Sequence, residues 1–264
     1  MTGPLSDVPP ASTEFLATVA ARELEGKQRV FAGVGLPTLA VDLAVRTLNP
    51  DLELVYESGV CGARPEAMAE GIADSVLVSG AAAVVPMPVL FGYVLQRGHV
   101  DVGFLGAAQV DRYGSLNTSF IGSWRDGARP DVRLPGAGGA VEVMANAGEV
   151  VVVLRRHDPG ALPDRLDFCT SPSPVAARAA DPRAVPRGFG LRTLITPKAV
   201  LRRRDRFGEL EVASVHPGVS LEEVRASTGW DVAVSPDVVE TRRPRVEDVR
   251  LLREEIDIVR LYLR

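Results

Sequence analysis

Hydrophobic residues in the first 160 positions alternate between short apolar runs and longer stretches with helical spacing. Residues 28–34 and 52–56 are runs typical of buried strands. Between them, apolar residues from Leu39 to Leu48 recur on one helical face. Pro37 suits the first turn of that helix, and Asn49-Pro50 suits its end. The pattern predicts a strand–helix–strand unit.

The same alternation continues to about residue 154. Continuous apolar strands separated by helices are typical of a parallel sheet covered on both faces. We therefore expect an α/β fold with an open, mostly parallel sheet and helices on both faces. The further elements predicted here are helices 88–96 (capped by Gly98) and 140–147 (ending at Gly148), strands 100–105, 116–120 and 150–154, and a turn at 111–114.

The pattern changes after Pro159, where residues 172–190 are rich in Pro, Arg and Ala and suggest a long surface excursion. Residues 1–13 carry three prolines with small polar residues and predict a flexible tail. Without an internal repeat, one domain over residues 14–264 is expected. Its C-terminal third is predicted to hold strands 191–195, 199–202 and 210–215, a helix from the capping box at Ser220 to Gly229, and a last helix over 246–256.

Composition and charge narrow the class of protein. Hydrophobic residues make up 46% and charged residues 24%, as in a soluble, packed protein. The net charge of −4 provides no overall basic field for nucleic acid or an anionic membrane. The start of the chain lacks the features of a signal peptide, and Cys61 and Cys169 form no disulfide framework. We expect a cytoplasmic protein with neither nucleic acid nor membrane as a partner.

Several common kinds of site are not supported. The three histidines are far apart, and neither cysteine lies in a pair with ligand spacing, so no metal site is predicted. No Gly-x-Ser-x-Gly elbow occurs. Gly33-Val34-Gly35 lacks the third glycine of a dinucleotide fingerprint and indicates a tight turn instead. A carboxylate or phosphate could still bind at the helix N-terminus that follows this turn.

Glu57 comes directly after the predicted strand 52–56 and is followed by Ser58 and Gly59. Ligands of open α/β sheets collect outside the carboxyl ends of the strands, where an acid can serve as a base or a nucleophile. The alternative interpretation is an acid that pairs with a cation or caps a loop.

Two small-residue segments also suggest pocket walls. Residues 136–139 (GAGG) stand before a predicted helix, so their backbone N–H groups could approach an oxyanion, although a structural turn is an equal alternative. Residues 106–111 (GAAQVD) end another predicted strand with small residues and polar groups.

Taken together, four segments resemble the β subunit of family I coenzyme A transferases, most closely of the glutaconate CoA-transferase type. The C-terminal LLREEID at 251–257 also resembles the end of these subunits, and the likeness runs from Phe15 to Asp257. In chain order, the four segments are 33–37 (GVGLP), 57–59 (ESG), 106–119 (GAAQVDRYGSLNTS) and 136–140 (GAGGA).

The resemblance implies a CoA-transferase (NagB/RpiA-like) fold and places Glu57 on the family's catalytic glutamate. It implies ping-pong transfer of CoA from an acyl-CoA to a free carboxylic acid, possibly a dicarboxylate, through a glutamyl-CoA thioester. No cofactor would be bound permanently, since the CoA thioester is the substrate. The implied site residues are Gly136, Gly138 and Gly139 as oxyanion or CoA-binding groups, and Gly33, Gly35, Ser58, Gly59, Gln109 and Asn117 as pocket residues.

The resemblance also implies a partner. The glycine-rich motif of the family's α subunit does not occur in this chain, so we expect activity with an α subunit, as a heterodimer, an α2β2 assembly or a larger one. Two alternatives remain open: an acyl-CoA hydrolase or decarboxylase on the same fold, and a non-catalytic subunit of such a complex.

Overall fold

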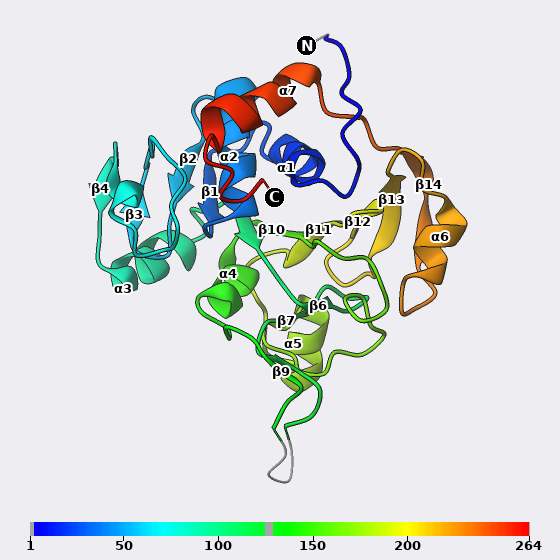
Figure 1. The fold of residues 1–264 in the computed structure, drawn as a ribbon. Helices are drawn as coiled ribbons and strands as arrows, with labels where there is room; N and C mark the ends of the chain where they lie inside the picture. Colours follow the sequence, from blue (N-terminus) through cyan, green and yellow to red (C-terminus); the bar gives the residue numbers. More distant parts are fainter. Residues whose placement is uncertain (1–2, 125–128, 264) are drawn as a thin grey trace.

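The computed structural model describes residues 3–124 and 129–263. A ten-stranded sheet runs through the molecule in the order β14-β13-β12-β11-β10-β5-β1-β2-β3-β4 (Figure 1). The five central strands, from β11 to β2, are parallel, which confirms the predicted mostly parallel sheet. The strands are β1 (Arg29–Ala32), β2 (Glu53–Val55), β3 (Val60–Cys61), β4 (Ala83–Val84), β5 (Val102–Leu105), β10 (Glu149–Val153), β11 (Leu191–Ile195), β12 (Ala199–Arg202), β13 (Glu211–Val215) and β14 (Ala233–Glu240).

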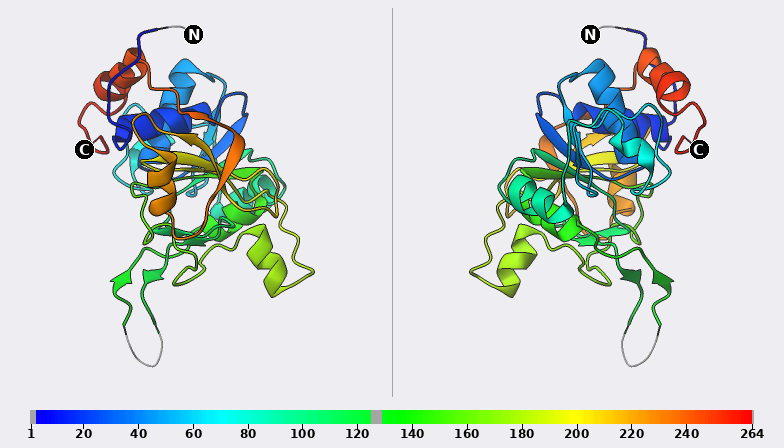
Figure 2. Two further views of the ribbon diagram at one scale, coloured as in Figure 1. Left: turned by 90° about the vertical axis from the view of Figure 1, so that its right-hand side faces the viewer. Right: turned by 90° about the vertical axis from the view of Figure 1, so that its left-hand side faces the viewer.

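Helices cover both faces of the sheet (Figures 1 and 2). Side chains alternate along each central strand, so Val30 joins the core beneath α1 and α2 while Phe31 joins the core beneath η2 and α4. Burial on both faces explains why these strands are continuous apolar runs. The helices are α1 (Thr13–Arg22), α2 (Leu36–Thr47), η1 (Ser75–Val78), α3 (Met87–Val89), η2 (Leu90–Leu95), α4 (Ala140–Asn146), α5 (Pro174–Ala180), α6 (Leu221–Ala226), α7 (Val246–Leu251) and η3 (Leu252–Ile256).

The predicted helices over 88–96 and 246–256 are present, but part of each is π-helical, at η2 and η3. Several elements are absent from the sequence-based prediction. They include α1, α5 within the expected surface excursion, the antiparallel edge strands β3 and β4, and β14. No helix within the described ranges is both long and apolar enough to cross a membrane.

The strand predicted over 116–120 is wrong as a single element. β7 (Leu116–Asn117) pairs with β6 (Gln109–Val110), whereas β8 (Phe120–Ile121) pairs with β9 (Val132–Arg133) in a separate hairpin. The Asn117 side-chain oxygen accepts hydrogen bonds from the backbone N–H groups of Ser119 (3.0 Å) and Phe120 (3.4 Å). This local turn interrupts the extended chain and redirects it outward.

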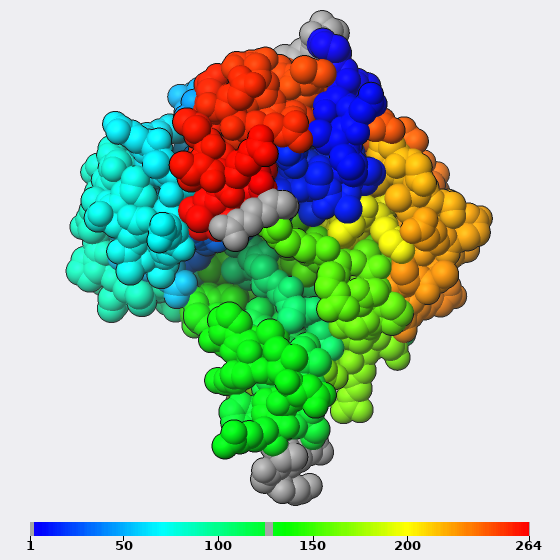
Figure 3. Space-filling model, viewed as in Figure 1, coloured from blue at the N-terminus to red at the C-terminus, as the bar shows by residue number. Residues whose placement is uncertain are grey.

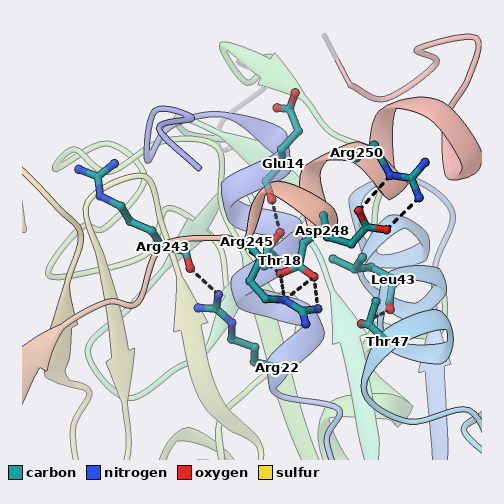
Figure 4. Close-up of polar contacts among 10 residues, drawn as sticks. Glu14, Thr18, Arg22, Leu43, Thr47, Arg243, Arg245, Asp248 and Arg250 are labelled. Carbon is teal, nitrogen blue, oxygen red and sulfur yellow. Dashed lines mark hydrogen bonds and ion pairs between the residues drawn. The ribbon is translucent and has the colours of Figure 1, made fainter. Parts of the chain in front are cut away.

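The N-terminal segment is expected to be a flexible tail, and two of its described residues pair with the chain before α7. Leu5 forms a β-bridge with Arg245, and the Ser6 N–H donates to the Pro244 carbonyl (2.8 Å). Arg22 of α1 donates to the carbonyl of Arg242 (2.6 Å). It also donates to the carbonyl of Arg243 (2.9 Å), as Figure 4 shows. The segment before α7 is therefore joined by hydrogen bonds to the N-terminal segment and to α1.

Candidate active site

Glu57 lies in a tight turn between the parallel centre of the sheet and its antiparallel edge. The Gly59 N–H donates to the Tyr56 carbonyl (2.9 Å), which leaves Glu57 and Ser58 at the two central positions of the turn. Gly59 has φ 100°, and a Cβ at this position would lie 1.9 Å from the carbonyl oxygen of Val85. Only glycine permits Val85, the residue after β4, to come this close, so Gly59 fixes the turn that carries Glu57.

A cavity of about 490 Å³ opens beside this turn. The space-filling view is hollowed between the C-terminal segment and the green residues near the base of the β8–β9 hairpin (Figure 3). Glu57 is the one ionisable side chain among the residues that line the cavity, within the described part of the chain. The carboxylate therefore faces a largely apolar space. Its lining residues are Phe31, Gly33, Val34, Pro37, Glu57, Phe104–Ala108, Thr118, Leu134–Ala137, Gly139 and Ala140.

The predicted glycine loop lies against the Glu57 carboxylate. A Cβ on Gly138 would lie 3.6 and 3.7 Å from the two carboxylate oxygens, and one on Gly139 would lie 3.3 Å from Oε1. The Gly136 N–H donates to the Thr118 carbonyl (2.8 Å). The Gly136 backbone N–H, although Gly136 lines the cavity, is therefore already used in a hydrogen bond. The N–H groups of Gly138 and Gly139 remain as the candidate hydrogen-bond donors beside Glu57.

Close packing of helix α4 holds this loop in place. A Cβ on Gly103 of β5 would lie 2.2 Å from Cγ1 of Val143, so glycine lets α4 rest directly on the sheet. At the start of the helix, a Cβ on Gly139 would lie 2.7 Å from Cζ of Phe91. The Phe91 ring in turn packs edge-on against Phe31, with 5.9 Å between ring centroids. The rings of Phe91 and Phe31 therefore pack behind the loop and leave no space for it to move toward the sheet.

The other predicted pocket residues separate into two groups. Gly33 lines the cavity, and its carbonyl accepts a hydrogen bond from the Thr38 hydroxyl (3.0 Å). Gly35, Ser58 and Gly59 are not among the lining residues of the described chain; Gly35 instead begins α2 with φ 116°. These residues shape the turns around the cavity.

Gln109 and Asn117 are buried away from the cavity and bond to each other. The Asn117 amide donates to Gln109 Oε1 (2.8 Å) and to the Phe120 carbonyl (2.7 Å), and Gln109 Nε2 donates to Asp167 (3.2 Å). Neither residue is among those that line the cavity in the described chain, because each amide is used to join β6 to β7 and to the loop near Asp167.

Sequence reasoning missed the aromatic and hydroxyl groups of the cavity wall. Phe31 and Phe104 are hydrophobic strand residues with no distinguishing local pattern. Thr118 also lines the cavity, and its Oγ1 is buried without a hydrogen-bond partner in the described structure. Its position inside the 106–119 segment is the one signal that could have found it. Across residues 3–124 and 129–263, no group of three or more His, Cys, Asp or Glu side chains could hold a metal ion.

Comparison with known proteins places this arrangement in a family. The family model for coenzyme A transferase matches residues 13–227. The chain is 39% identical to the β subunit of the 3-oxoadipate CoA-transferase of Pseudomonas knackmussii over 92% of each chain. It is 27% identical to the β subunit of the glutaconate CoA-transferase of Acidaminococcus fermentans, over 92% of this chain and 91% of that one.

Solved structures agree with the sequence comparisons. The glutaconate CoA-transferase of Acidaminococcus fermentans superposes with a TM-score of 0.85, covering 98% of this chain and 99% of that chain at 26% identity. The decarboxylase AibA/AibB gives a TM-score of 0.78 over 96% of this chain and 97% of that chain, also at 26% identity. The chain with a carboxylate in this apolar cavity belongs to the coenzyme A transferase family, among its β subunits.

Proposed function

We propose that this chain, together with an α subunit, transfers coenzyme A between an acyl-CoA and a free carboxylic acid, with Glu57 as the nucleophile. The observation that carries the proposal is the placement of one carboxylate in an apolar cavity directly beside Gly138 and Gly139. A carboxylate with little competing water is a better nucleophile toward a thioester, and the thioester's free energy is not lost to hydrolysis.

The proposed reaction proceeds through two covalent species. The Glu57 carboxylate attacks the thioester carbonyl, the C–S bond breaks, and an acyl–glutamyl anhydride and CoA thiolate are formed. The thiolate then attacks the Glu57 carbonyl carbon, which releases the first acid and leaves a glutamyl-CoA thioester. A second carboxylate attacks that thioester, and the same two steps in reverse give the new acyl-CoA and free Glu57.

Each of these steps passes through a tetrahedral oxyanion, which needs hydrogen-bond donors in place before the reaction. Backbone amides can approach closely at Gly138 and Gly139 because neither residue carries a Cβ. We assign the donor role to this pair. The Gly136 amide is not assigned to it, because it already donates to Thr118.

A dicarboxylic acid is the proposed substrate class. The 39% identity to the β subunit of a 3-oxoadipate CoA-transferase supports it. No cation is among the cavity-lining residues of the described chain, so the second carboxylate of such an acid would be recognised by the α subunit. The test is to measure transfer from succinyl-CoA to 3-oxoadipate, glutaconate and acetoacetate with the assembled complex. Equal rates for the monocarboxylate would contradict this substrate class.

The nucleophile is tested by chemical trapping. The complex is incubated with acyl-CoA and then hydroxylamine, and Glu57 is analysed by peptide mass spectrometry. A hydroxamate on Glu57, absent from Glu57→Gln and retained in the exposed-residue control Glu25→Gln, is the expected result. Turnover of acyl-CoA without any enzyme-bound hydroxamate would exclude the covalent route.

One alternative has specific support. The superposition with the decarboxylase AibA/AibB indicates that this fold also serves a different reaction, in which Glu57 would act as a base or an orienting group. Carbon dioxide release from a 3-carboxylated acyl-CoA, without transfer of CoA to an added acid, would favour this alternative.

A further inference from the structure

Glu57 and Thr118 are the two residues with polar side chains among those that line the cavity in the described chain. The other lining residues are glycines or carry apolar side chains. An ionised carboxylate accepts hydrogen bonds and donates none. Any hydrogen bond that a lining side chain of this chain donates to a substrate must therefore come from the Thr118 hydroxyl.

The backbone of Thr118 is held on both sides. Its N–H donates to Thr170 Oγ1 (3.0 Å), and its carbonyl accepts a hydrogen bond from the Gly136 N–H (2.8 Å). Asn117 fixes the turn around it by accepting a hydrogen bond from the Ser119 N–H (3.0 Å). These bonds keep the Thr118 backbone beside the glycine loop and leave its side chain as the part that can respond to a ligand.

The Thr118 hydroxyl, in contrast, is buried and accepts or donates no hydrogen bond among the described residues. A buried hydroxyl without a partner is costly, so native proteins keep few of them and such a group calls for an explanation. Because no bond holds this hydroxyl in place, rotation about the Cα–Cβ bond can turn it toward the cavity without breaking one.

The surroundings indicate which acceptor the hydroxyl suits. A carboxylate buried in an apolar cavity needs a cation or several donors, whereas a neutral carbonyl oxygen is satisfied by one donor. The cavity wall supplies one hydroxyl, and the amides of Gly138 and Gly139 are assigned to the reacting thioester. A second, neutral carbonyl of the bound substrate is therefore the acceptor that fits Thr118.

We propose that Thr118 is a specificity-determining residue, whose hydroxyl turns into the cavity and donates a hydrogen bond to a keto oxygen on the acyl chain. Thr118 is bonded to Gly136, two residues or up to roughly 7 Å before Gly138. We therefore place the keto group at C3, one carbon farther from the thioester than an adjacent ketone. The proposal rests on the proposed function for the class of substrate. An amide carbonyl of pantetheine is the competing acceptor.

The test removes the hydroxyl and the keto group separately. The complex with the α subunit is assayed as wild type, Thr118→Val, Thr118→Ser and Ser171→Ala, with succinyl-CoA as the donor and either 3-oxoadipate or adipate as the acceptor. Adipate has the same chain and both carboxylates but lacks the keto group. Ser171 is the matched control, because its hydroxyl is also buried without a partner in the described structure, but the residue is not among those that line the cavity.

We expect Thr118→Val to lower kcat/KM for 3-oxoadipate by about 5- to 150-fold, the range for leaving a buried polar group without its partner, and to leave adipate unchanged. Thr118→Ser should keep the preference for 3-oxoadipate, and Ser171→Ala should not change the ratio of the two acids. Equal losses for both acids in Thr118→Val would assign the hydroxyl to a group common to both reactions, such as a pantetheine amide, and overturn the proposal. Unchanged kcat/KM for both acids would also overturn it.

Thermal stability distinguishes substrate recognition from a structural role. Valine has nearly the shape of threonine and replaces the unpartnered hydroxyl with a methyl group, so the melting temperature of Thr118→Val should equal or exceed that of the wild type. A lower melting temperature would indicate that the hydroxyl has a partner within the protein and would overturn the proposal.

Binding without turnover separates this proposal from the proposed function. Complexes that carry Glu57→Gln are titrated calorimetrically with 3-oxoadipyl-CoA and with adipyl-CoA, with and without Thr118→Val. Weaker binding of 3-oxoadipyl-CoA alone in the double variant supports the hydrogen bond even if the wild-type complex shows no transfer, in which case the proposed function alone fails. If Thr118→Val weakens neither ligand, or weakens both equally, the hydrogen bond is overturned whether or not transfer occurs.

Discussion

Adding one methyl group at Gly139 tests the geometry of the site most directly. The added Cβ would lie 2.7 Å from Cζ of Phe91 and 3.3 Å from Oε1 of Glu57. Carbon atoms in good contact are about 3.5–4.0 Å apart, so the ring or the loop must move by about 1 Å. The φ of −80° at Gly139 suits alanine, so the effect is one of crowding and not of backbone strain.

A displacement of about 1 Å near the reacting atoms costs on the order of 10²-fold in rate, and loss of an oxyanion donor costs a similar 10²–10³-fold. We therefore expect Gly139→Ala to lower turnover of the folded complex by at least about 100-fold. Overpacking should also lower the free energy of unfolding by about 1–3 kcal/mol. Turnover and the melting temperature are both measured, on complexes assembled with the α subunit.

Two comparisons show which effect is responsible. Gly138→Ala brings strain at φ 47° but only ordinary contacts with Glu57, and Gly26→Ala brings strain at φ 72° with nothing within 4 Å. Both variants should lose about 1–2 kcal/mol in free energy of unfolding. Turnover should fall less in Gly138→Ala than in Gly139→Ala, and it should not change in Gly26→Ala. Adding Phe91→Leu to Gly139→Ala should recover part of the turnover. A folded Gly139→Ala complex with near wild-type turnover would refute this account of the loop.

Three further predictions concern the nucleophile, the partner and the buried histidines. Glu57→Asp withdraws the carboxylate by one methylene and should reduce transfer by at least about 10²-fold with an unchanged melting temperature; near wild-type turnover would exclude Glu57 as the nucleophile. The purified chain alone should show no CoA transfer, and adding its α subunit should restore it, as measured by acyl-CoA exchange. Burial lowers the pKa of His157 and of His216 to about 4, so both fold as neutral rings and the unfolded chain binds more protons below pH 6.5. Each histidine should therefore reduce stability by about 2 kcal/mol between pH 7 and pH 5. Burial raises the pKa of Asp42 to about 6 and opposes this trend. A variant His157→Gln should be less stable at pH 7 but lose less stability on acidification, and an unchanged slope of melting temperature against pH would contradict the assignment.

The sequence predicts the parts of the fold that depend on local pattern. Apolar runs mark the buried parallel strands, and the end of one such run locates Glu57. Helix α1 is absent from the sequence-based prediction although eight of its ten residues are buried and the Ser12 side chain caps its start by accepting a hydrogen bond from the Phe15 N–H.

The cavity itself depends on contacts between residues distant in sequence, which no local pattern contains. Gly139 and Glu57 are brought together by the packing of α4 on β5, and Phe91 completes the wall from another helix. Gln109 and Asn117 illustrate a second way in which the site depends on the folded structure. Two polar residues in a small-residue segment indicate a pocket, but whether a buried amide faces a ligand or another amide is decided only by the folded structure.

The turn that carries Glu57 leaves the identity of that residue free. Its shape is set by the hydrogen bond between Tyr56 and Gly59 and by the approach of Val85 to Gly59. The side chain at position 57 takes no part in either contact. The turn can therefore accept a different side chain at position 57 without a change in its backbone, so that the reactive group and the scaffold that presents it can vary independently.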